Sequence, residues 1–407
     1  MAHILLVTAE GQDSRGFSRS RRQAFRHALR HHEFCEFPVN TASTSSQNPF
    51  HPDFKAQLEK ATSNAYAVVT CGPFHPLLAL PQLPEEIPVW VDFPSDPLAD
   101  IHLQWLNNSD TEASHHAQTT AKLALECAIV RGDQFGLISP ELRLSFLGQL
   151  LFYGRRLDTP MALCHLTPIT QPLGDKLLPA TRNPREPLTL LLCGHANTWL
   201  NAESIAVGVQ SSLQEIENLT IEITGGPRFQ STDTWDTLTQ LKHDRITIHG
   251  WLSDAEFTQC IKRSHVGFWL DKPGIEPLLG CRTRGITMLH HGRSLIATAS
   301  NEWHKHLSQV GVLRHAEDSA GLMEAIRAEW EHPSVVTETV LDHRSVDLVF
   351  KPLLKWLEAP HMTHHPIPET IQAHYIELQQ NYRRLLKSPS VRGLNWIHRK
   401  LKKPFDP

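Results

Sequence analysis

The chain has 407 residues, of which 40% are hydrophobic and 20% charged, with a formal net charge of −4. This is the composition of a soluble globular protein, and the length favours two domains over a single hydrophobic core. The charge balance gives no reason to expect nucleic acid as a partner, and the absence of an uncharged apolar run of about 18 residues argues against a membrane-spanning helix.

The first half of the chain alternates short apolar runs with helical patterns. Its predicted strands are Ile4–Val7, Tyr66–Thr70 and Val89–Val91, and its predicted helices are an amphipathic stretch around Ala24 to Leu29, residues 117–130 and Glu141–Tyr153. The strands end in glycine, proline or aspartate, which is typical of the turns between strands and helices in an open sheet. Such alternation predicts a parallel, doubly wound sheet.

Four prolines between residues 171 and 187 break any regular element, so this segment is the predicted linker. The alternation then restarts, with strands predicted at Leu188–Cys193, Leu219–Thr224, Arg245–His249, Val266–Leu270 and Ser294–Ala297, and helices at Glu203–Leu213, Ser253–Arg263 and Ala320–Glu331. Ser253 and Glu256 have the spacing of a capping box.

We therefore predict an α/β protein of two doubly wound, Rossmann-like domains that face a cleft. The expected boundaries are 1–180 for the first domain, 187–345 for the second, and 346–407 for C-terminal helices that could cross back to the first domain.

Cysteine and histidine usage bears on compartment and metal binding. The seven cysteines are dispersed without a CxxC pair, and the first residues are typical of a strand rather than a signal peptide. We expect reduced thiols in a cytoplasmic protein. Several of the 26 histidines are chain neighbours, such as His290 and His291, and neighbours on a helix do not share a face. No metal site is expected.

The segment Gly274 to Arg284 carries the most chemistry. It places Glu276, a glycine turn, Arg282 and Arg284 directly after the predicted strand Val266–Leu270. At the carboxyl end of a parallel strand, arginines can fork onto phosphate oxygens and a carboxylate can accept sugar hydroxyls. The alternatives are a solvated glutamate, and arginines in a helix start or a domain-interface ion pair. Alternate helix residues do not share a face, so one arginine could be the phosphate ligand.

Two further strand ends carry candidate ligand-binding residues. Asn197, Thr198 and Trp199 offer two hydrogen-bonding side chains and a flat ring, which suit a sugar or a base, although a helix cap with Trp199 in the core is an equal reading. Gly225 and Gly226 permit the close backbone approach of a diphosphate or nucleotide. A plain turn between strand and helix is the alternative there.

These pieces together resemble one group of GT-B glycosyltransferases. Gly194 to Trp199 is similar to the group's Gly-Phe-Asn-Thr-Trp segment, and Thr224–Gly226, His249–Ser253 and Glu276–Arg284 follow in the group's order. Ser139 to Arg155 resembles its Leu-Gly-Glu-Leu and Gly-Arg segment. The likeness covers most of residues 130–300.

The resemblance implies transfer of a sugar from a nucleotide-diphosphate donor, the co-substrate, to a hydroxyl of a glycan, lipid-linked or other acceptor. It implies no further cofactor, with Glu276 on sugar hydroxyls and Arg282 or Arg284 on the diphosphate. An Asp-x-Asp metal motif is not evident, so protein cations are expected to offset the diphosphate charge. A general base would come from the first domain, where Asp13, Asp92 and Asp96 follow strands and none is singled out.

The chain also departs from the group's pattern. Arg284 stands where a second glutamate is common, Thr287 and Asn201 stand where aspartates are found, and His195 replaces a glycine. His195 could bind phosphate when protonated or serve as a neutral cap. The lost acidic positions favour one alternative, a catalytically inactive glycosyltransferase-like binding or scaffold subunit. A nucleotide-sugar 2-epimerase on the same fold is a third reading.

Near its C-terminus the sequence changes character. Residues 392–403 hold five basic residues and no acid, with Leu394, Ile397 and Leu401 at helical spacing. A basic amphipathic helix suits peripheral contact with an anionic membrane surface, here the inner face, and would fit a lipid-linked acceptor. A terminal helix packed across the two domains, or a frayed tail, are the alternatives.

Overall fold

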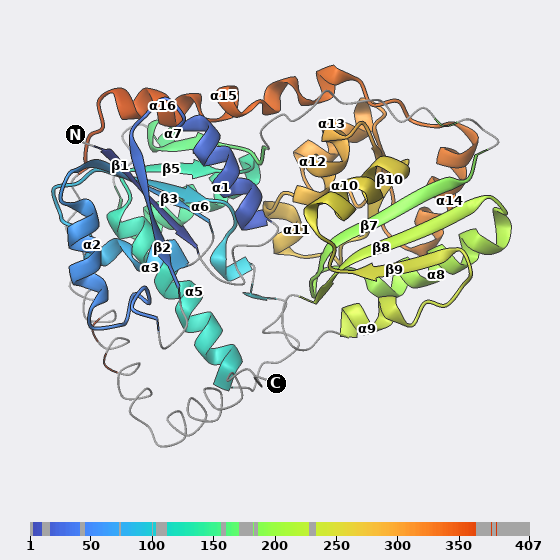
Figure 1. Cartoon of the computed structure of the whole chain (residues 1–407), viewed down its shortest axis with the longest axis horizontal. Helices are drawn as coiled ribbons and strands as arrows, with labels where there is room; N and C mark the ends of the chain where they lie inside the picture. Colours follow the sequence, from blue (N-terminus) through green and yellow to red (C-terminus); the bar gives the residue numbers. More distant parts are fainter. Residues whose placement is uncertain are drawn as a thin grey trace, which may run out of the picture.

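The computed structural model describes residues 3–9, 17–40, 45–72, 75–99, 101–102, 112–155, 160–170, 182, 186–227, 233–363, 376 and 380. Within these residues the chain forms two six-stranded parallel sheets, each flanked by helices (Figure 1). The predicted α/β class with two doubly wound sheets is confirmed. Residues 392–403, the expected basic helix, and most of the expected linker lie outside the described residues.

The first sheet has the strand order β2-β1-β3-β4-β5-β6. Its elements are β1 (His3–Ala9), α1 (Phe17–Ala28), β2 (Phe34–Val39), α2 (Phe54–Thr62), β3 (Ala65–Cys71), α3 (His75–Leu78), η2 (Leu80–Gln82), β4 (Val89–Phe93), α5 (Glu112–Arg131), β5 (Gln134–Leu137), α6 (Pro140–Phe152), α7 (Pro160–Leu163) and β6 (Cys164–Leu166). Every residue of β4 is buried, as expected for an inner strand covered by helices on both faces.

The second sheet has the order β12-β11-β10-β7-β8-β9. Its elements are β7 (Leu188–Ala196), α8 (Ala202–Glu215), β8 (Leu219–Pro227), α9 (Asp233–Thr239), β9 (Ile246–Gly250), α10 (Asp254–Arg263), β10 (Val266–Trp269), α11 (Ile275–Leu279), α12 (Thr283–His290), β11 (Ser294–Ala297), α13 (Glu302–Gln309), β12 (Leu313–His315) and α14 (Ser319–Glu331). The order places β10, β7 and β8 side by side, so the segments that follow them share one edge. The predicted capping box of Ser253 and Glu256 is present at α10.

Beyond α14 the chain returns to the first sheet through η3 (Glu338–Arg344), α15 (Val346–Val349) and α16 (Lys351–Glu358). In Figure 1 these last helices run over α1 and the first sheet. Phe350 is fully buried there, with its ring centroid 4.5 Å from that of Phe25, and the Trp356 ring lies 5.8 Å from Trp90. Part of the first domain's core is therefore supplied from the far end of the chain.

Specific contacts join the two domains beside the carboxyl edge of the second sheet. The Ser139 hydroxyl caps α6 by accepting from the backbone of Leu142, and it donates to the carbonyl of Leu279 in α11 at 2.8 Å. A Glu141 carboxylate oxygen accepts from the backbone N–H of Glu302 at 2.7 Å. The start of α6 thus lies against α11 and α13.

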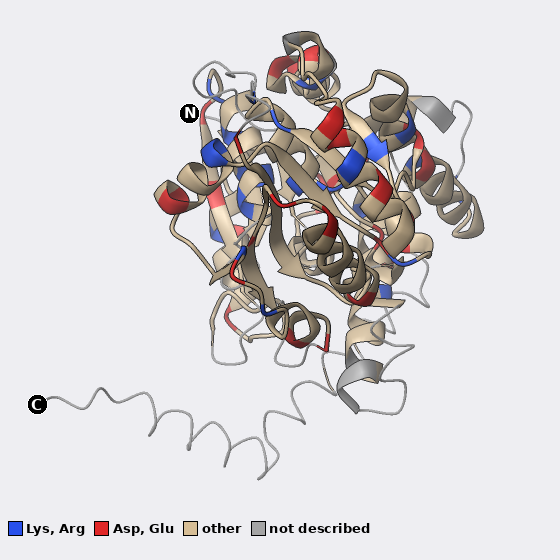
Figure 2. Cartoon of the chain, turned by 90° about the vertical axis from the view of Figure 1, so that its right-hand side faces the viewer, with Lys and Arg blue, Asp and Glu red and all other residues tan. Residues whose placement is uncertain are grey.

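Charged residues of both signs are mixed on one side of the molecule. Figure 2 shows basic and acidic residues interspersed on the side that faces the viewer, which agrees with the small net charge of −4. Among the described helices, none is long and apolar enough to span a membrane.

Candidate functional site

The segments singled out in the sequence meet at the carboxyl edge of the second sheet. Arg284 donates from Nη2 to the carbonyl of His195, near the end of β7, at 3.0 Å. The backbone N–H of Lys272, beyond β10, donates to the carbonyl of Trp199 at 2.6 Å. The Arg282 guanidinium carbon lies 5.7 Å from the centre of the Trp199 ring. Residues 194–199 and 271–284 therefore form one local structure.

Arg282 is bound by two carboxylates. Its Nη1 and Nη2 donate to the two oxygens of Glu276 at 2.8 and 2.7 Å, and its Nε donates to Asp271 at 2.9 Å. All three side chains are buried. Pro273 and Gly274 predict a loop for Glu276, but this residue lies in the short helix α11, a single turn between Gly274 and Gly280. The fork of Arg282 fixes the direction of the Glu276 carboxylate.

The electrostatics of this cluster follow from its charges. Burial alone would lower the pKa of Arg282, but the carboxylates of Asp271 and Glu276 outweigh it and raise that pKa. Arg282 therefore stays charged and is the cation that faces the two carboxylates. Each Glu276 oxygen accepts one N–H from Arg282 and retains a second lone pair, with which it can accept a ligand hydroxyl.

Arg284 has a different environment, although it stands only two residues further on. It sits in the first turn of α12, half-buried, and burial lowers its pKa. Its bond to the His195 carbonyl uses one of the five N–H donors of the guanidinium. Among the described residues this is its one hydrogen bond to protein. Arg284 is thus the arginine whose remaining N–H groups are available to a ligand at the sheet edge.

Two polar atoms at the end of β7 are buried without a partner among the residues described: Asn197 Oδ1 and Thr198 Oγ1. The helix-cap reading does not apply to them, because Asn201 caps α8 by accepting from the backbone of Ser204. Trp199 is buried, as the core reading supposed, and its ring lies beneath Arg282. An unsatisfied buried polar atom costs about 1–3 kcal/mol, so both are suited to a ligand's hydrogen bonds.

The glycine pair at the end of β8 is required by close approaches. Gly225 has φ of +121°, and a Cβ there would lie 1.9 Å from the carbonyl oxygen of Gly194. A Cβ on Gly226 would lie 2.6 Å from Nε1 of Trp251. The ends of β7 and β8 thus pack backbone to backbone, and an indole covers the second glycine.

Trp251 is the residue that site prediction from sequence left out. It is 47% exposed, and its ring lies edge-on to His195 with centroids 4.8 Å apart. The sequence does hold an indication of this residue, because Gly250 and Trp251 directly follow a predicted strand. The pair was used only as part of the resemblance to the glycosyltransferase group. In the structure, the Trp251 ring presents an exposed aromatic face beside Gly225 and Gly226.

The first-domain aspartates have structural partners. Asp92 is fully buried and accepts from Arg21 at 2.6 and 3.1 Å; burial raises its pKa, opposed by Arg21. One oxygen of Asp96 accepts from the backbone of Leu98 and the other from Gln149, each at 2.8 Å. Both carboxylates are thus engaged by protein groups and neither stands out as a general base. Asp13 lies outside the described residues.

No protein-family model matches the chain, and no curated protein matches it in sequence. Solved structures do match. HepE of Anabaena, in complex with UDP and glucose, has a TM-score of 0.59 at 12% identity, over 88% of this chain and 100% of that one. Sucrose-phosphate synthase of Thermosynechococcus elongatus has 0.53 at 14%, over 95% and 100%. A putative UDP-N-acetylglucosamine 2-epimerase of Listeria monocytogenes has 0.51 at 10%, over 88% and 96%. These similarities show that the chain has the GT-B fold.

Proposed function

We propose that this GT-B chain is a glycosyltransferase, which moves a sugar from a nucleotide-diphosphate donor to a hydroxyl of a glycan, lipid-linked or other acceptor. The observation that carries the proposal is the meeting of an oriented carboxylate, an arginine with donors to offer and two unsatisfied polar side chains at one sheet edge. The complex of HepE with UDP-glucose, a protein of the same fold, supports a donor of this class.

In this proposal, Glu276 binds the sugar and Arg284 the diphosphate. Glu276 is held by Arg282, so its free lone pairs have a fixed direction and can accept sugar hydroxyls without loss of side-chain entropy. As the bond to the anomeric carbon breaks, negative charge grows on the leaving diphosphate. Arg284, in the first turn of α12, and the positive end of that helix would stabilise this charge.

The base of the nucleotide would lie against Trp251. The indole is exposed and covers Gly226, where a side chain would prevent its approach. A flat apolar face of this kind suits stacking with a base. Asn197 and Thr198 would then hydrogen-bond the ribose or the sugar.

We further propose that the transfer needs no metal ion, because Arg284 and the α12 terminus supply the positive charge. Transfer rates that are unchanged by added Mg²⁺ or Mn²⁺ would support this part of the proposal.

The decisive experiment measures nucleotide-sugar binding by calorimetry with a panel of uridine, guanosine and thymidine diphosphate sugars. We expect Arg284→Ala to weaken binding of the preferred donor at least tenfold, which is about 1.4 kcal/mol, with little change in melting temperature. Arg284→Lys should recover part of the affinity, because a point charge replaces the fork. Failure of the wild-type chain to bind any donor in the panel would overturn the proposal.

One observation favours a second candidate. Both oxygens of Glu276 already accept from Arg282, which suits a site that holds a nucleotide sugar without turning it over. Such a binding or scaffold subunit would bind the donor tightly and show neither transfer nor donor hydrolysis. A 2-epimerase, the activity in the name of the Listeria protein, would instead turn over its nucleotide sugar with no acceptor present.

A further inference from the structure

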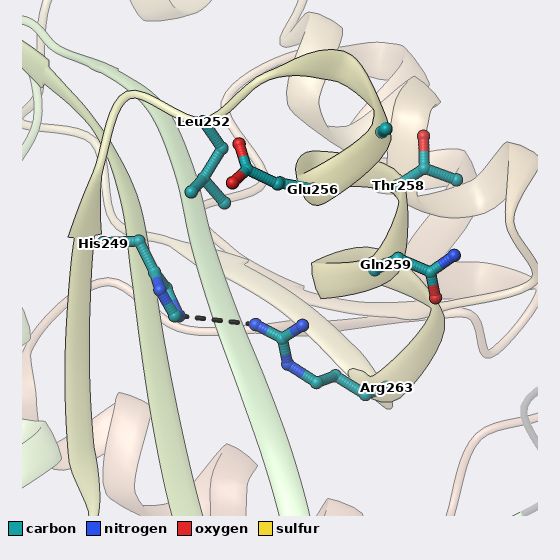
Figure 3. A pocket seen from close by; sticks show the side chains of 7 residues that line it. His249, Leu252, Glu256, Thr258, Gln259 and Arg263 are labelled. Atoms are coloured by element: carbon teal, nitrogen blue, oxygen red, sulfur yellow. Dashed lines mark hydrogen bonds between the residues drawn. The ribbon is translucent and has the colours of Figure 1, made fainter.

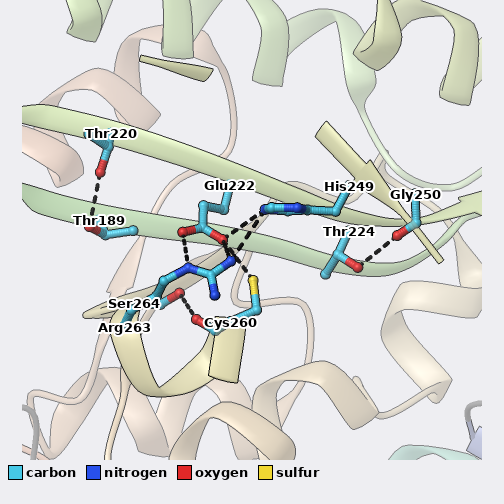
Figure 4. A network of polar contacts seen from close by, with 9 residues as sticks. All are labelled: Thr189, Thr220, Glu222, Thr224, His249, Gly250, Cys260, Arg263 and Ser264. Atoms are coloured by element: carbon cyan, nitrogen blue, oxygen red, sulfur yellow. Dashed lines mark hydrogen bonds and ion pairs between the residues drawn. The ribbon is translucent and has the colours of Figure 1, made fainter. Parts of the chain in front are cut away.

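A second cluster of polar side chains lies on the outer part of the second domain, between β8, β9 and α10. Its members are Glu222, His249 and Cys260, with Arg263 beside them (Figure 4). The distance from His249 Nε2 to Glu222 Oε2 is 3.0 Å, and that from Cys260 Sγ to the same oxygen is 2.8 Å. One donor atom from each of the three lies within 4.8 Å of the other two.

The backbone brings these side chains together through an irregularity in the sheet. Ile223 of β8 pairs with Ile248 of β9, but the next residue, Thr224, pairs with Gly250. His249 is therefore the extra residue of a β-bulge, a feature that redirects a side chain. Cys260 is fully buried on α10, the helix whose start is fixed by its capping box. Three different elements thus fix the three donors.

The donor types are those of a transition-metal site. A thiolate, an imidazole and a carboxylate are the three ligands that Zn²⁺ takes from proteins, and three protein ligands leave a fourth position for water. The site also has an entrance. His249 and Arg263 line an open pocket of about 570 Å³, together with Leu252, Glu256 and Gln259 (Figure 3).

In this structure a cationic side chain lies against two of the three donors. The Arg263 guanidinium binds both oxygens of Glu222, and its Nη2 lies 3.4 Å from His249 Nε2. The side chain is 47% exposed at the end of α10, so it can turn out into solvent without being buried elsewhere. A divalent ion would take over its role as the countercharge of Glu222.

We propose that Glu222, His249 and Cys260 form a zinc site, with water as the fourth ligand, and that Arg263 occupies the position of the ion until the ion displaces it. On binding, Cys260 loses the proton that its thiol now donates to Glu222, and this proton passes to solvent. Arg263 keeps its charge and moves outward. The ion would tie β9 to α10, one residue before Gly250 and Trp251, and it takes no part in sugar transfer.

The experiment uses Co²⁺ as a probe on the full chain after treatment with a chelator. Cobalt bound to a thiolate gives a ligand-to-metal charge-transfer band that histidine and carboxylate sites lack, which matters in a chain with 26 histidines. We expect one Co²⁺ per chain with this band, and its loss when one equivalent of Zn²⁺ is added. Cys260→Ser should abolish the band, and His249→Gln should lower the affinity for Co²⁺ at least tenfold.

Arg263→Gln provides the sharpest test, because it removes the competing cation and leaves the three ligands in place. It should bind Co²⁺ more tightly than the wild type. The matched controls are Cys35→Ser and His243→Gln, at exposed positions, which should leave both band and affinity unchanged. Absence of the band in both the wild type and Arg263→Gln, or its persistence in Cys260→Ser, would overturn the proposal.

Discussion

Arg282 and Arg284 are separated by one residue but have opposite surroundings. Arg282 faces inward onto Asp271 and Glu276, while Arg284 reaches the end of β7. The difference follows from α12, which begins at Thr283, so the two guanidiniums lie on either side of a helix start. One arginine is a structural countercharge and the other is a candidate ligand-binding residue.

Arg282→Ala should therefore act on stability first. It leaves two buried carboxylates without their cation, which is expected to cost about 3–5 kcal/mol of unfolding free energy. Denaturant unfolding of the variant beside Arg284→Ala measures the contrast. A stable Arg282→Ala protein that has lost nucleotide-sugar affinity would show instead that Arg282 is the ligand-binding arginine.

Gly225 is the glycine on which the sheet edge depends most. Its φ of +121° and the 1.9 Å approach of a Cβ to the Gly194 carbonyl both oppose any side chain. Gly225→Ala should lower the unfolding free energy by more than about 2 kcal/mol. The control is Gly148→Ala in α6, where nothing lies within 4 Å of the new Cβ and a gain of about 0.5–1 kcal/mol is expected.

His304 should make the protein sensitive to acid. Both ring nitrogens are buried without a partner among the described residues, and burial, then Arg282 and Arg344, lower its pKa from 6.5 to about 3. Between these values the unfolded chain binds a proton that the folded chain does not. The unfolding free energy therefore falls as the pH drops below 6.5, by up to about 1.4 kcal/mol per pH unit from this residue.

His304→Leu should flatten the dependence of unfolding free energy on pH between about pH 6 and 4. His306→Gln, an exposed position in the same helix α13, is the control and should retain the wild-type slope. Urea unfolding at a series of pH values measures both. Equal slopes in wild type and His304→Leu would show that the imidazole is protonated in the folded state.

At the scale of elements, most inner strands were predictable and most edge strands were not: among the edge strands only β9 was predicted, and among the inner strands only β5 was missed. β10 and β11 are apolar runs buried on both faces, β7 and β8 are largely buried, and the predicted ranges lie close to the observed ones. β2 was missed because it is an edge strand that carries Glu36 and Pro38, which weaken the apolar pattern.

The candidate site shows the same division between local pattern and long-range contact. Glycines and polar residues after a strand end are visible in the sequence, so the segments were found. The ion pairs of Arg282 join residues 271, 276 and 282 through side-chain directions that no spacing specifies. The bulge at His249 depends likewise on pairing between β8 and β9.

α15 is an element whose role can be tested directly. Phe350, which follows it, is fully buried against Phe25, and the Arg21 guanidinium lies 4.9 Å from its ring centre. Phe350→Ala should cost about 3–5 kcal/mol of unfolding free energy. Leu348→Ala, in α15 itself but 49% exposed, should change it by less than about 0.5 kcal/mol. Similar losses in the two variants would contradict this assignment of the core.

At the scale of the whole molecule, the two domains meet where the proposed donor site lies. Ser139 and Glu141 at the start of α6 contact α11 and α13, the elements that follow β10 and β11. A shift of one domain on the other would therefore move α11, and Glu276 with it. Coupling of this kind would link movement between the two domains to the position of the carboxylate in the proposed donor site.

The return of α15 and α16 also sets an order of events during synthesis. Residues 346–358 cover part of the first sheet's core, yet the ribosome makes them after the whole second domain. The second domain can complete its own core while the first still exposes the apolar surface around Phe25 and Trp90. The domain that is translated first thus completes its core last, and apolar surface stays exposed on it until residues 346–358 have been made.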